Sequence, residues 1–185
     1  MGIEKLAKSG TLHTYMKGRV ICREGDEGET AFIVISGAVN IVLNFRSAHP
    51  ELICVLEAGS FVGEMSLFLK HKRTATVTTS VDGTTILEVD MDSFGNFLRE
   101  DAGTCFKLMK SLTVRIDEML VKIGDFDKKF QYQFKKSTYY QLAHQLYQPE
   151  FWKLANENPE GAINLIKYLC SSLESLNNKY MSSSH

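Results

Sequence analysis

The sequence predicts an α+β protein in which an antiparallel, jelly-roll-like β-roll is followed by helices. Between residues 12 and 90, short segments rich in β-branched residues alternate with turns that contain glycine, a rhythm typical of a small antiparallel roll or barrel. After residue 90, apolar residues recur every three or four positions, as they do in amphipathic helices. The length of 185 residues suits one such core with an extension.

Within the roll, the strands are expected between successive turn signals. The pattern predicts strands over 31–35, 39–43, 52–56 and 84–89. The first two of these flank Ser36-Gly37-Ala38, which we interpret as a hairpin because glycine adopts the positive φ that tight turns require. Short helices are expected over 3–8, before the roll, and over 65–69, within it.

Two helices are predicted directly after the roll. The first covers residues 91–98, and the second, longer helix covers about 104–123. In the longer helix, apolar residues alternate at steps of four and three, which is the pattern of a coiled-coil seam: Cys105, Met109, Leu112, Ile116, Met119 and Ile123. We expect this helix to form a homodimer with a second copy. The alternative is that the stripe packs against the roll of the same chain.

The remaining residues predict a helical extension of unknown role. A connector is expected over 125–130, followed by helices over 137–147, 150–156 and 159–180. The last helix has a capping pair at its start, Asn158-Pro159, and one apolar side, so it should cover another surface. We therefore divide the chain into a domain of residues 1–123, with the long helix as lid or dimer arm, and an extension of residues 124–185.

Composition excludes several classes of function. The formal net charge of −1 provides no overall attraction to nucleic acid or to an anionic membrane. No segment has the apolar length of a signal peptide or of a membrane span, so we expect a cytoplasmic protein. No two cysteines form a Cys-x-x-Cys pair, and the histidines are scattered, so we expect no metal and free thiols at Cys22, Cys54, Cys105 and Cys170.

One segment, residues 59–77, carries most of the chemical information. It places a glycine and an acid at Gly63-Glu64, a short apolar helix after them, and Arg73 at the entrance of a β-branched run. A guanidinium can clamp two oxygens of a phosphate, free amides at a helix start attract an anion, and a carboxylate can accept a hydrogen bond from a sugar hydroxyl. The segment therefore predicts a pocket for a small phosphate ester with a sugar.

The same residues resemble the phosphate-binding cassette of the cyclic nucleotide-binding domain family, which includes the catabolite activator and the regulatory subunits of protein kinases. The resemblance rests on the run from Phe61 to Leu67 and on Arg73-Thr74-Ala75-Thr76-Val77, nine positions after Glu64. The turns at Gly18, Gly25-Asp26 and Gly37 also match in order and spacing, so about two thirds of the chain is covered. Lys72 departs from the family pattern, in which a proline commonly precedes the arginine.

The resemblance implies a cyclic mononucleotide as ligand and gives each site residue a role. Arg73 would bind the exocyclic phosphate oxygens, and Glu64 would accept from the ribose 2′-hydroxyl. Thr74 could contact the phosphate and the 2-amino group of a guanine in the syn conformation. Cyclic AMP is the first expectation and cyclic GMP the second. The expected ligand-binding residues are Gly63, Glu64, Met65, Ser66, Arg73, Thr74 and Ala75.

We therefore expect a non-catalytic sensor that signals ligand occupancy through its C-terminal helices, with a possible downstream protein partner. A catabolite-activator-like transcription regulator is the first alternative, but the tail is rich in aromatic and amide residues and lacks a basic recognition helix, so DNA binding is not expected. A scaffold with a vestigial pocket is the second. No nucleophile triad or phosphate-binding P-loop favours an enzyme.

Overall fold

The computed structural model describes residues 8, 10–125, 127–136, 141 and 156–183. The chain forms two compact units, Met1–Phe97 and Leu98–His185. This spatial division falls within the helix that follows the roll, whereas the sequence analysis places a domain boundary after residue 123. A functional boundary at residue 123 therefore stays a prediction.

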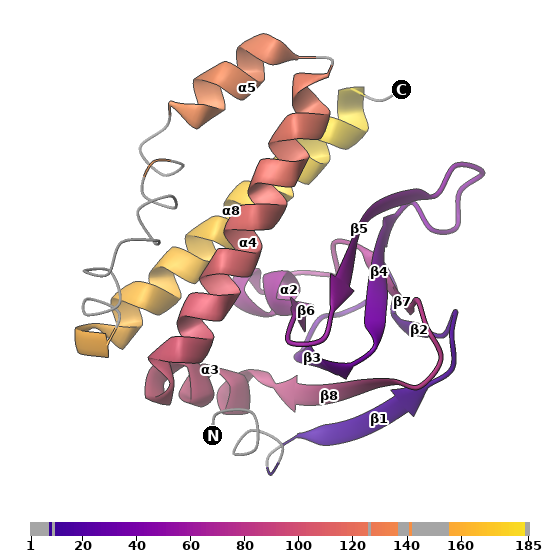
Figure 1. The fold of residues 1–185 in the computed structure, drawn as a ribbon. Coiled ribbons are helices and arrows are strands. Elements are labelled where there is room, and N and C mark those ends of the chain that lie inside the picture. Colours follow the sequence, from indigo (N-terminus) through magenta and orange to yellow (C-terminus); the bar gives the residue numbers. More distant parts are fainter. Residues whose placement is uncertain (1–7, 9, 126, 137–140, 142–155, 184–185) are drawn as a thin grey trace. The chain divides into compact units, whose positions relative to one another are not determined.

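The first unit is a β-roll of two four-stranded antiparallel sheets, so the predicted fold class is confirmed (Figure 1). One sheet has the order β1-β8-β3-β6 and the other β2-β7-β4-β5. The strands are β1 (Thr11–Tyr15), β2 (Val20–Cys22), β3 (Thr30–Ser36), β4 (Ala38–Leu43), β5 (Glu51–Glu57), β6 (Phe61–Val62), β7 (Thr76–Thr79) and β8 (Thr84–Asp90). The hairpin between β3 and β4 turns at Gly37, whose φ of 80° is positive as expected.

The core of the roll is apolar and draws on both sheets. Its buried members share alternate positions along six strands: Cys22, Phe32, Val34, Val39, Ile41, Val62, Val77 and Ile86. Because side chains alternate between the two faces of a strand, the residues between these members point to the opposite face, where Ala31, Ile33, Leu87 and Val89 are also buried. The register of the strands therefore decides which polar side chains point inward with the core.

Two helices belong to the roll wholly or in part. Helix α2 (Glu64–Leu69) is the short helix predicted after Gly63. Helix α3 (Met91–Glu100) begins where Asp90 accepts hydrogen bonds from the backbone nitrogen of Ser93 at 2.8 Å and from its hydroxyl at 3.0 Å. Phe94 of α3 is fully buried and lies with its ring centre 5.8 Å from that of Phe61 and 6.0 Å from that of Phe68.

The second unit is built around two long helices, α4 (Ala102–Gly124) and α8 (Pro159–Ser183), with the shorter α5 (Lys128–Lys135). Helices α4 and α8 lie along each other and run in the same direction (Figure 1). At one end, Arg99 forms an ion pair with Glu160, and at the other the ammonium of Lys122 lies 5.6 Å from the ring centre of Tyr180. The apolar side of the last helix therefore covers α4.

The apolar stripe predicted on the long helix is buried within the single chain. Its members are at most 3% exposed: Cys105, Met109, Leu112, Ile116, Met119 and Ile123. From the sequence, this stripe was expected to pack against a second copy or against the roll, and α8 was not predicted as its partner. A homodimer through this helix remains a prediction, but its contact would need a surface other than the buried stripe, such as the exposed Val114 and Val121.

The connector expected over 125–130 is wrong in its second half, because α5 begins at Lys128. Asp127 starts this helix by accepting a hydrogen bond from the backbone nitrogen of Phe130 at 2.9 Å, and its carboxylate also pairs with Lys179 at 3.0 Å. The predicted start of the last helix is confirmed, since Asn158 caps it through the backbone nitrogen of Gly161 at 2.9 Å. The helices expected over 3–8, 137–147 and 150–156 lie almost wholly outside the described residues.

The described residues show neither a membrane-spanning helix nor a cluster of metal ligands. None of the helices among them combines the length and apolarity that a bilayer crossing requires. In the same part of the chain, no three His, Cys, Asp or Glu side chains gather closely enough to hold a metal ion.

The cap of α3 makes the stability of the roll depend on pH. Hydrogen bonds from Ser93 hold the pKa of Asp90 below its ordinary value of 3.8. We expect Asp90→Ala to lower the free energy of unfolding by about 1 kcal/mol at pH 7. A carboxylate with a lowered pKa stabilises the fold above its unfolded pKa, so this difference should shrink as the pH falls below about 4.

Urea denaturation of both proteins across this pH range measures the effect. Asp92→Ala is the matched control, because it removes a charge from the same turn and leaves the Asp90 cap in place. A loss that is equal at both ends of the pH range would contradict the assignment of Asp90 as a charged cap.

Candidate functional site

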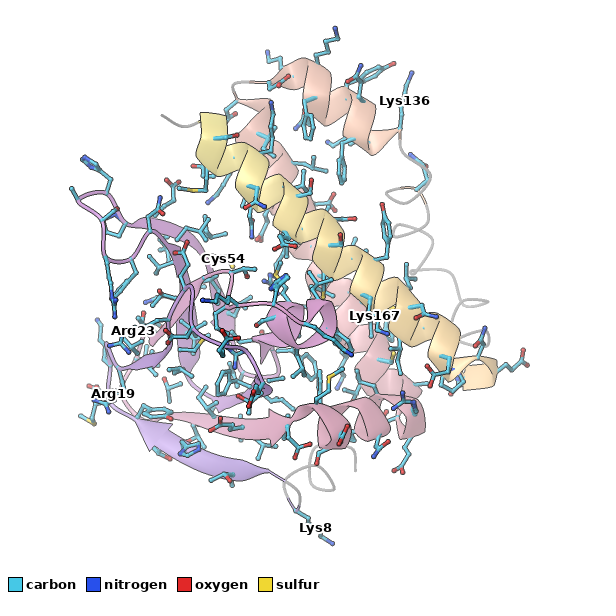
Figure 2. The ribbon with its side chains drawn as sticks, turned by 180° about the vertical axis from the view of Figure 1, so that it is seen from behind. Lys8, Arg19, Arg23, Cys54, Lys136 and Lys167 are labelled. Atoms are coloured by element: carbon cyan, nitrogen blue, oxygen red, sulfur yellow. The ribbon has the colours of Figure 1, made fainter. Side chains whose placement is uncertain are left out.

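The side chain of Arg73 is buried in the first unit and is 6% exposed. Its Nη1 donates to the carbonyl oxygen of Gly63 at 3.0 Å and to Oγ of Ser66 at 3.2 Å, and its Nη2 donates to Oγ1 of Thr30 at 3.1 Å. Arg19 and Arg23, in contrast, are exposed at the periphery of the roll (Figure 2). A buried cation is costly unless hydrogen bonds compensate for lost water, so these three acceptors fix the guanidinium in one place.

The backbone of Arg73 is fixed as well. Its carbonyl oxygen accepts from the nitrogen of Gly25 at 2.9 Å, and its nitrogen donates to the carbonyl oxygen of Asp26 at 2.8 Å. Both partners lie in the loop between β2 and β3. The guanidinium carbon also lies 5.1 Å from the ring centre of Phe32, within the range of a cation–π contact. Groups of the protein itself therefore hold Arg73 at both its backbone and its guanidinium.

Gly63 is the closest neighbour of the guanidinium, and the geometry requires a glycine there. Its φ of 77° lies in the left-handed region that other residues rarely adopt. A methyl group on its Cα would also collide with Nη1 of Arg73. Its carbonyl oxygen accepts from Arg73, from the hydroxyl of Ser66 at 3.2 Å and from the nitrogen of Leu67 at 3.4 Å. Gly63 thus ties the start of α2 to the arginine.

Glu64 is the first residue of α2 and is 1% exposed. Its carboxylate and the guanidinium of Arg73 both act on the thiol of Cys22. Burial raises the pKa of this thiol to about 11, the positive charge of Arg73 opposes the rise, and the carboxylates of Asp26 and Glu64 add to it. Glu64 and Arg73, which the sequence predicts as a pair, therefore lie in one region of the roll. At neutral pH, Cys22 stays a protonated thiol.

Three further predicted residues surround this pair. Met65 is buried, as expected of a residue that anchors the helix in the core. The hydroxyl of Thr74 points to the sulfur of Met65 at 3.8 Å, a contact with a weak acceptor. Ala75 packs against the core of the roll. The structure thus gathers all seven predicted residues around α2 and the start of β7, although their roles toward a ligand stay predictions.

An open hollow of about 300 Å³ lies beside this cluster. It is lined by residues of the loop between β2 and β3, of α2 and its C-terminal end, and of the start of α3: Glu27, Gly28, Glu29, Ser66, Leu67, Lys70, His71 and Met91. Of the predicted site residues, Ser66 lines the hollow. Because the hydroxyl of Ser66 also accepts from Arg73, this residue links the hollow to the guanidinium.

Thr30 and Phe32 both contact Arg73 from β3, and neither was predicted from the sequence as part of the site. Side chains two positions apart share one face of a strand, so an inward Phe32 implies that Thr30 faces the same way. That alternation was visible in the sequence. The identity of their partner was not, because Arg73 lies more than 40 positions away and only the fold brings it to β3.

This chain is similar to known proteins in sequence and in fold. The protein-family model described as "Cyclic nucleotide-binding domain" matches residues 12–101. The cGMP-dependent protein kinase egl-4 of Caenorhabditis elegans is 32% identical over 136 residues, which are 69% of this chain and 17% of the kinase. The cAMP-activated global transcriptional regulator Vfr of Pseudomonas aeruginosa is 27% identical over 127 residues, which are 66% of this chain and 59% of the regulator.

Among solved structures, a cAMP-binding acyltransferase from Mycobacterium smegmatis has a TM-score of 0.55 and 24% sequence identity. The match covers 64% of this chain and 36% of that protein, and it shows likeness of fold alone. The chain spans less than a fifth of the kinase and about three fifths of the regulator. The two-sheet roll, the cassette around Arg73 and the match over residues 12–101 agree. Residues 12–101 of the chain therefore belong to the cyclic nucleotide-binding domain family.

Proposed function

We propose that this protein is a non-catalytic cytoplasmic sensor that binds cyclic AMP or cyclic GMP at the cassette formed by residues 63–75. The observation that carries the proposal is the buried guanidinium of Arg73, whose hydrogen-bond acceptors at Gly63, Ser66 and Thr30 are all neutral. Neutral acceptors orient a cation without cancelling its charge. The guanidinium therefore keeps its attraction for an anion such as a cyclic phosphate.

The hydrogen bonds of Arg73 also indicate which donors remain for a phosphate. Within the described residues, Nη1 has two acceptors and Nη2 has one, which leaves Nε and one proton of Nη2. Nε and Nη2 share one edge of the planar guanidinium, and such an edge suits two oxygens of one phosphate. Glu64 would accept from the ribose, as the family resemblance implies. Opposite charges would then recognise the two halves of the ligand.

Replacing Arg73 tests this site directly. Each charge-assisted hydrogen bond contributes roughly 1.5 to 3 kcal/mol, so we expect Arg73→Ala to weaken binding of either nucleotide by about two orders of magnitude or more. Arg73→Lys keeps the charge but loses the planar fork, and it should also bind weakly. Isothermal titration calorimetry with cyclic AMP and cyclic GMP provides the measurement.

Arg23→Ala serves as the control, because it removes a positive charge from an exposed position of the same roll. Thermal unfolding without ligand reports whether each variant keeps its fold. Unchanged affinity in a folded Arg73→Ala variant would refute the proposed site.

The choice between the two nucleotides depends on Thr74. Its hydroxyl has only the weak thioether acceptor of Met65 in the described structure, so a ligand can engage it. The kinase relative is named as cGMP-dependent, whereas the bacterial regulator is named as cAMP-activated, so similarity alone supports either ligand. We infer that cyclic GMP gains a contact from Thr74 that cyclic AMP lacks.

We therefore expect Thr74→Ala to weaken cyclic GMP binding about tenfold and to change cyclic AMP binding by less than about threefold, since one lost hydrogen bond costs on the order of 1 kcal/mol. Thr74→Ser keeps the hydroxyl and should retain the preference of the wild type. Competition of each nucleotide against a fluorescent analogue measures both affinities. An equal loss for both ligands would mean that Thr74 contacts the shared phosphate.

We further propose that occupancy is signalled through the C-terminal helices. A ligand shifts a conformational equilibrium only if it binds one arrangement more tightly than another. Under this proposal, the backbone amides of 106–123 in α4 should exchange hydrogen more slowly in the presence of saturating ligand. Hydrogen–deuterium exchange with mass spectrometry tests the idea, with the Arg73→Ala variant as the control. Exchange in this segment that ignores a bound ligand would contradict it.

Two alternative functions, a transcription regulator and a scaffold, predict different results in binding experiments. A transcription regulator, as the bacterial relative is named, would also shift a DNA fragment in a gel, whereas we expect no DNA binding. A scaffold with a vestigial pocket would bind neither nucleotide, although its tail could still bind a downstream protein partner. Sedimentation velocity with and without ligand would measure the predicted homodimer.

A further inference from the structure

Three polar side chains connect Arg73 to the surface of the roll through consecutive hydrogen bonds. Nη2 of Arg73 donates to Oγ1 of Thr30 at 3.1 Å, and the same hydroxyl donates to Oε1 of Glu88 at 3.1 Å. The other carboxylate oxygen, Oε2 of Glu88, lies 3.1 Å from Nε2 of His13. We call Thr30, Glu88 and His13 the polar chain. Arg73 is buried, whereas the side chains of His13 and Glu88 are each 35% exposed, so the polar chain reaches from a buried cation to solvent.

The direction of these hydrogen bonds follows from the chemistry of the groups. A guanidinium only donates and a carboxylate only accepts. The one proton of the Thr30 hydroxyl must therefore point to Glu88, which leaves its oxygen lone pairs for Arg73. The Thr30 hydroxyl therefore accepts from Arg73 and donates to Glu88 at the same time. A side chain of the same shape without a hydroxyl would break both bonds.

The strand register explains why these residues meet. Thr30 and Phe32 share one face of β3, and Phe32 lies opposite Glu88 on β8. His13 on β1 lies opposite Ile86, two positions from Glu88 and on the same face of that strand. Because Phe32 and Ile86 belong to the core, this is the inward face of the sheet, where a polar group is retained only with partners. In Figure 1, β1, β8 and β3 can be followed side by side.

From this geometry we propose that Thr30 is a positioning residue for Arg73, and that Glu88, held by His13, orients Thr30. Glu88 then acts on the guanidinium through one hydroxyl, so it orients the cation without forming an ion pair that would compete with an incoming phosphate. The effect of Thr30 and Glu88 on ligand affinity rests on the function proposed above. The effect of Thr30 and Glu88 on the conformation of Arg73 does not rest on that function, since these hydrogen bonds join groups of the protein itself.

The test compares Thr30→Val, which keeps the shape and removes the hydroxyl, with Thr30→Ser, which keeps the hydroxyl. We expect Thr30→Val to weaken cyclic nucleotide binding about tenfold and Thr30→Ser to stay within about threefold of the wild type. In the protein without ligand, the Nε–H resonance of Arg73 should shift and exchange faster with water in Thr30→Val, and it should return in Thr30→Ser. Its assignment comes from its loss in Arg73→Lys.

A double-mutant cycle tests whether Glu88 acts through Thr30. Glu88→Leu removes the acceptor and should weaken binding about threefold, but it should have no further effect in a Thr30→Val background. Additive effects would show that Glu88 acts on the ligand directly and would overturn the relay. Unchanged Nε–H resonance and affinity in a folded Thr30→Val variant would overturn the positioning role.

Ligand affinity tests the proposed function, whereas the Nε–H resonance of Arg73 tests the positioning role of Thr30. If the wild type binds neither nucleotide, the proposed function fails, and the resonance of Arg73 in the Thr30 variants still decides whether Thr30 positions it. If Thr30→Val does not fold, Glu88→Leu provides the same resonance measurement one bond further along the polar chain. A resonance that stays unchanged in Glu88→Leu would then contradict the proposal.

Discussion

A buried positive charge imposes the main constraint on the first unit. The guanidinium of Arg73 loses most of its water inside the roll, and the cost of that loss must be offset by acceptors that reach it from several elements. Gly63 and Ser66 provide them from the start of α2, and Thr30 provides one from β3. The loop between β2 and β3 holds the backbone of the same residue. One side chain therefore joins segments that are far apart in the sequence.

This arrangement reconciles two demands on a binding site for anions. A cation that is to attract a phosphate must stay charged and unpaired with acids, yet a buried cation without partners would destabilise the fold. Neutral carbonyl and hydroxyl acceptors meet both demands, because they orient the guanidinium and leave its net charge intact. The carboxylate of Glu88 contributes only through the hydroxyl of Thr30, and this separation distinguishes it from a direct ion pair.

The second unit depends on apolar packing rather than on charge. Helix α8 lies along α4, and the stripe that the sequence analysis assigned to a coiled coil is buried within one chain. A heptad pattern indicates that a helix has one apolar side, but it does not predict which surface covers that side. The spacing alone could not distinguish a second copy of the chain from a helix that begins 57 positions further along the same chain.

What the sequence by itself determined is local in character. Turn glycines, alternating strands and the cassette from Gly63 to Ala75 follow from residue type and spacing, because backbone conformation and strand periodicity are set by near neighbours. Even the cap at Asn158 could be predicted for this reason. Only the tertiary structure decided that Thr30 and Phe32 contact Arg73, that Thr30 connects Arg73 to Glu88, and that α8 covers α4. Those features depend on contacts between distant segments, whose register no local pattern specifies.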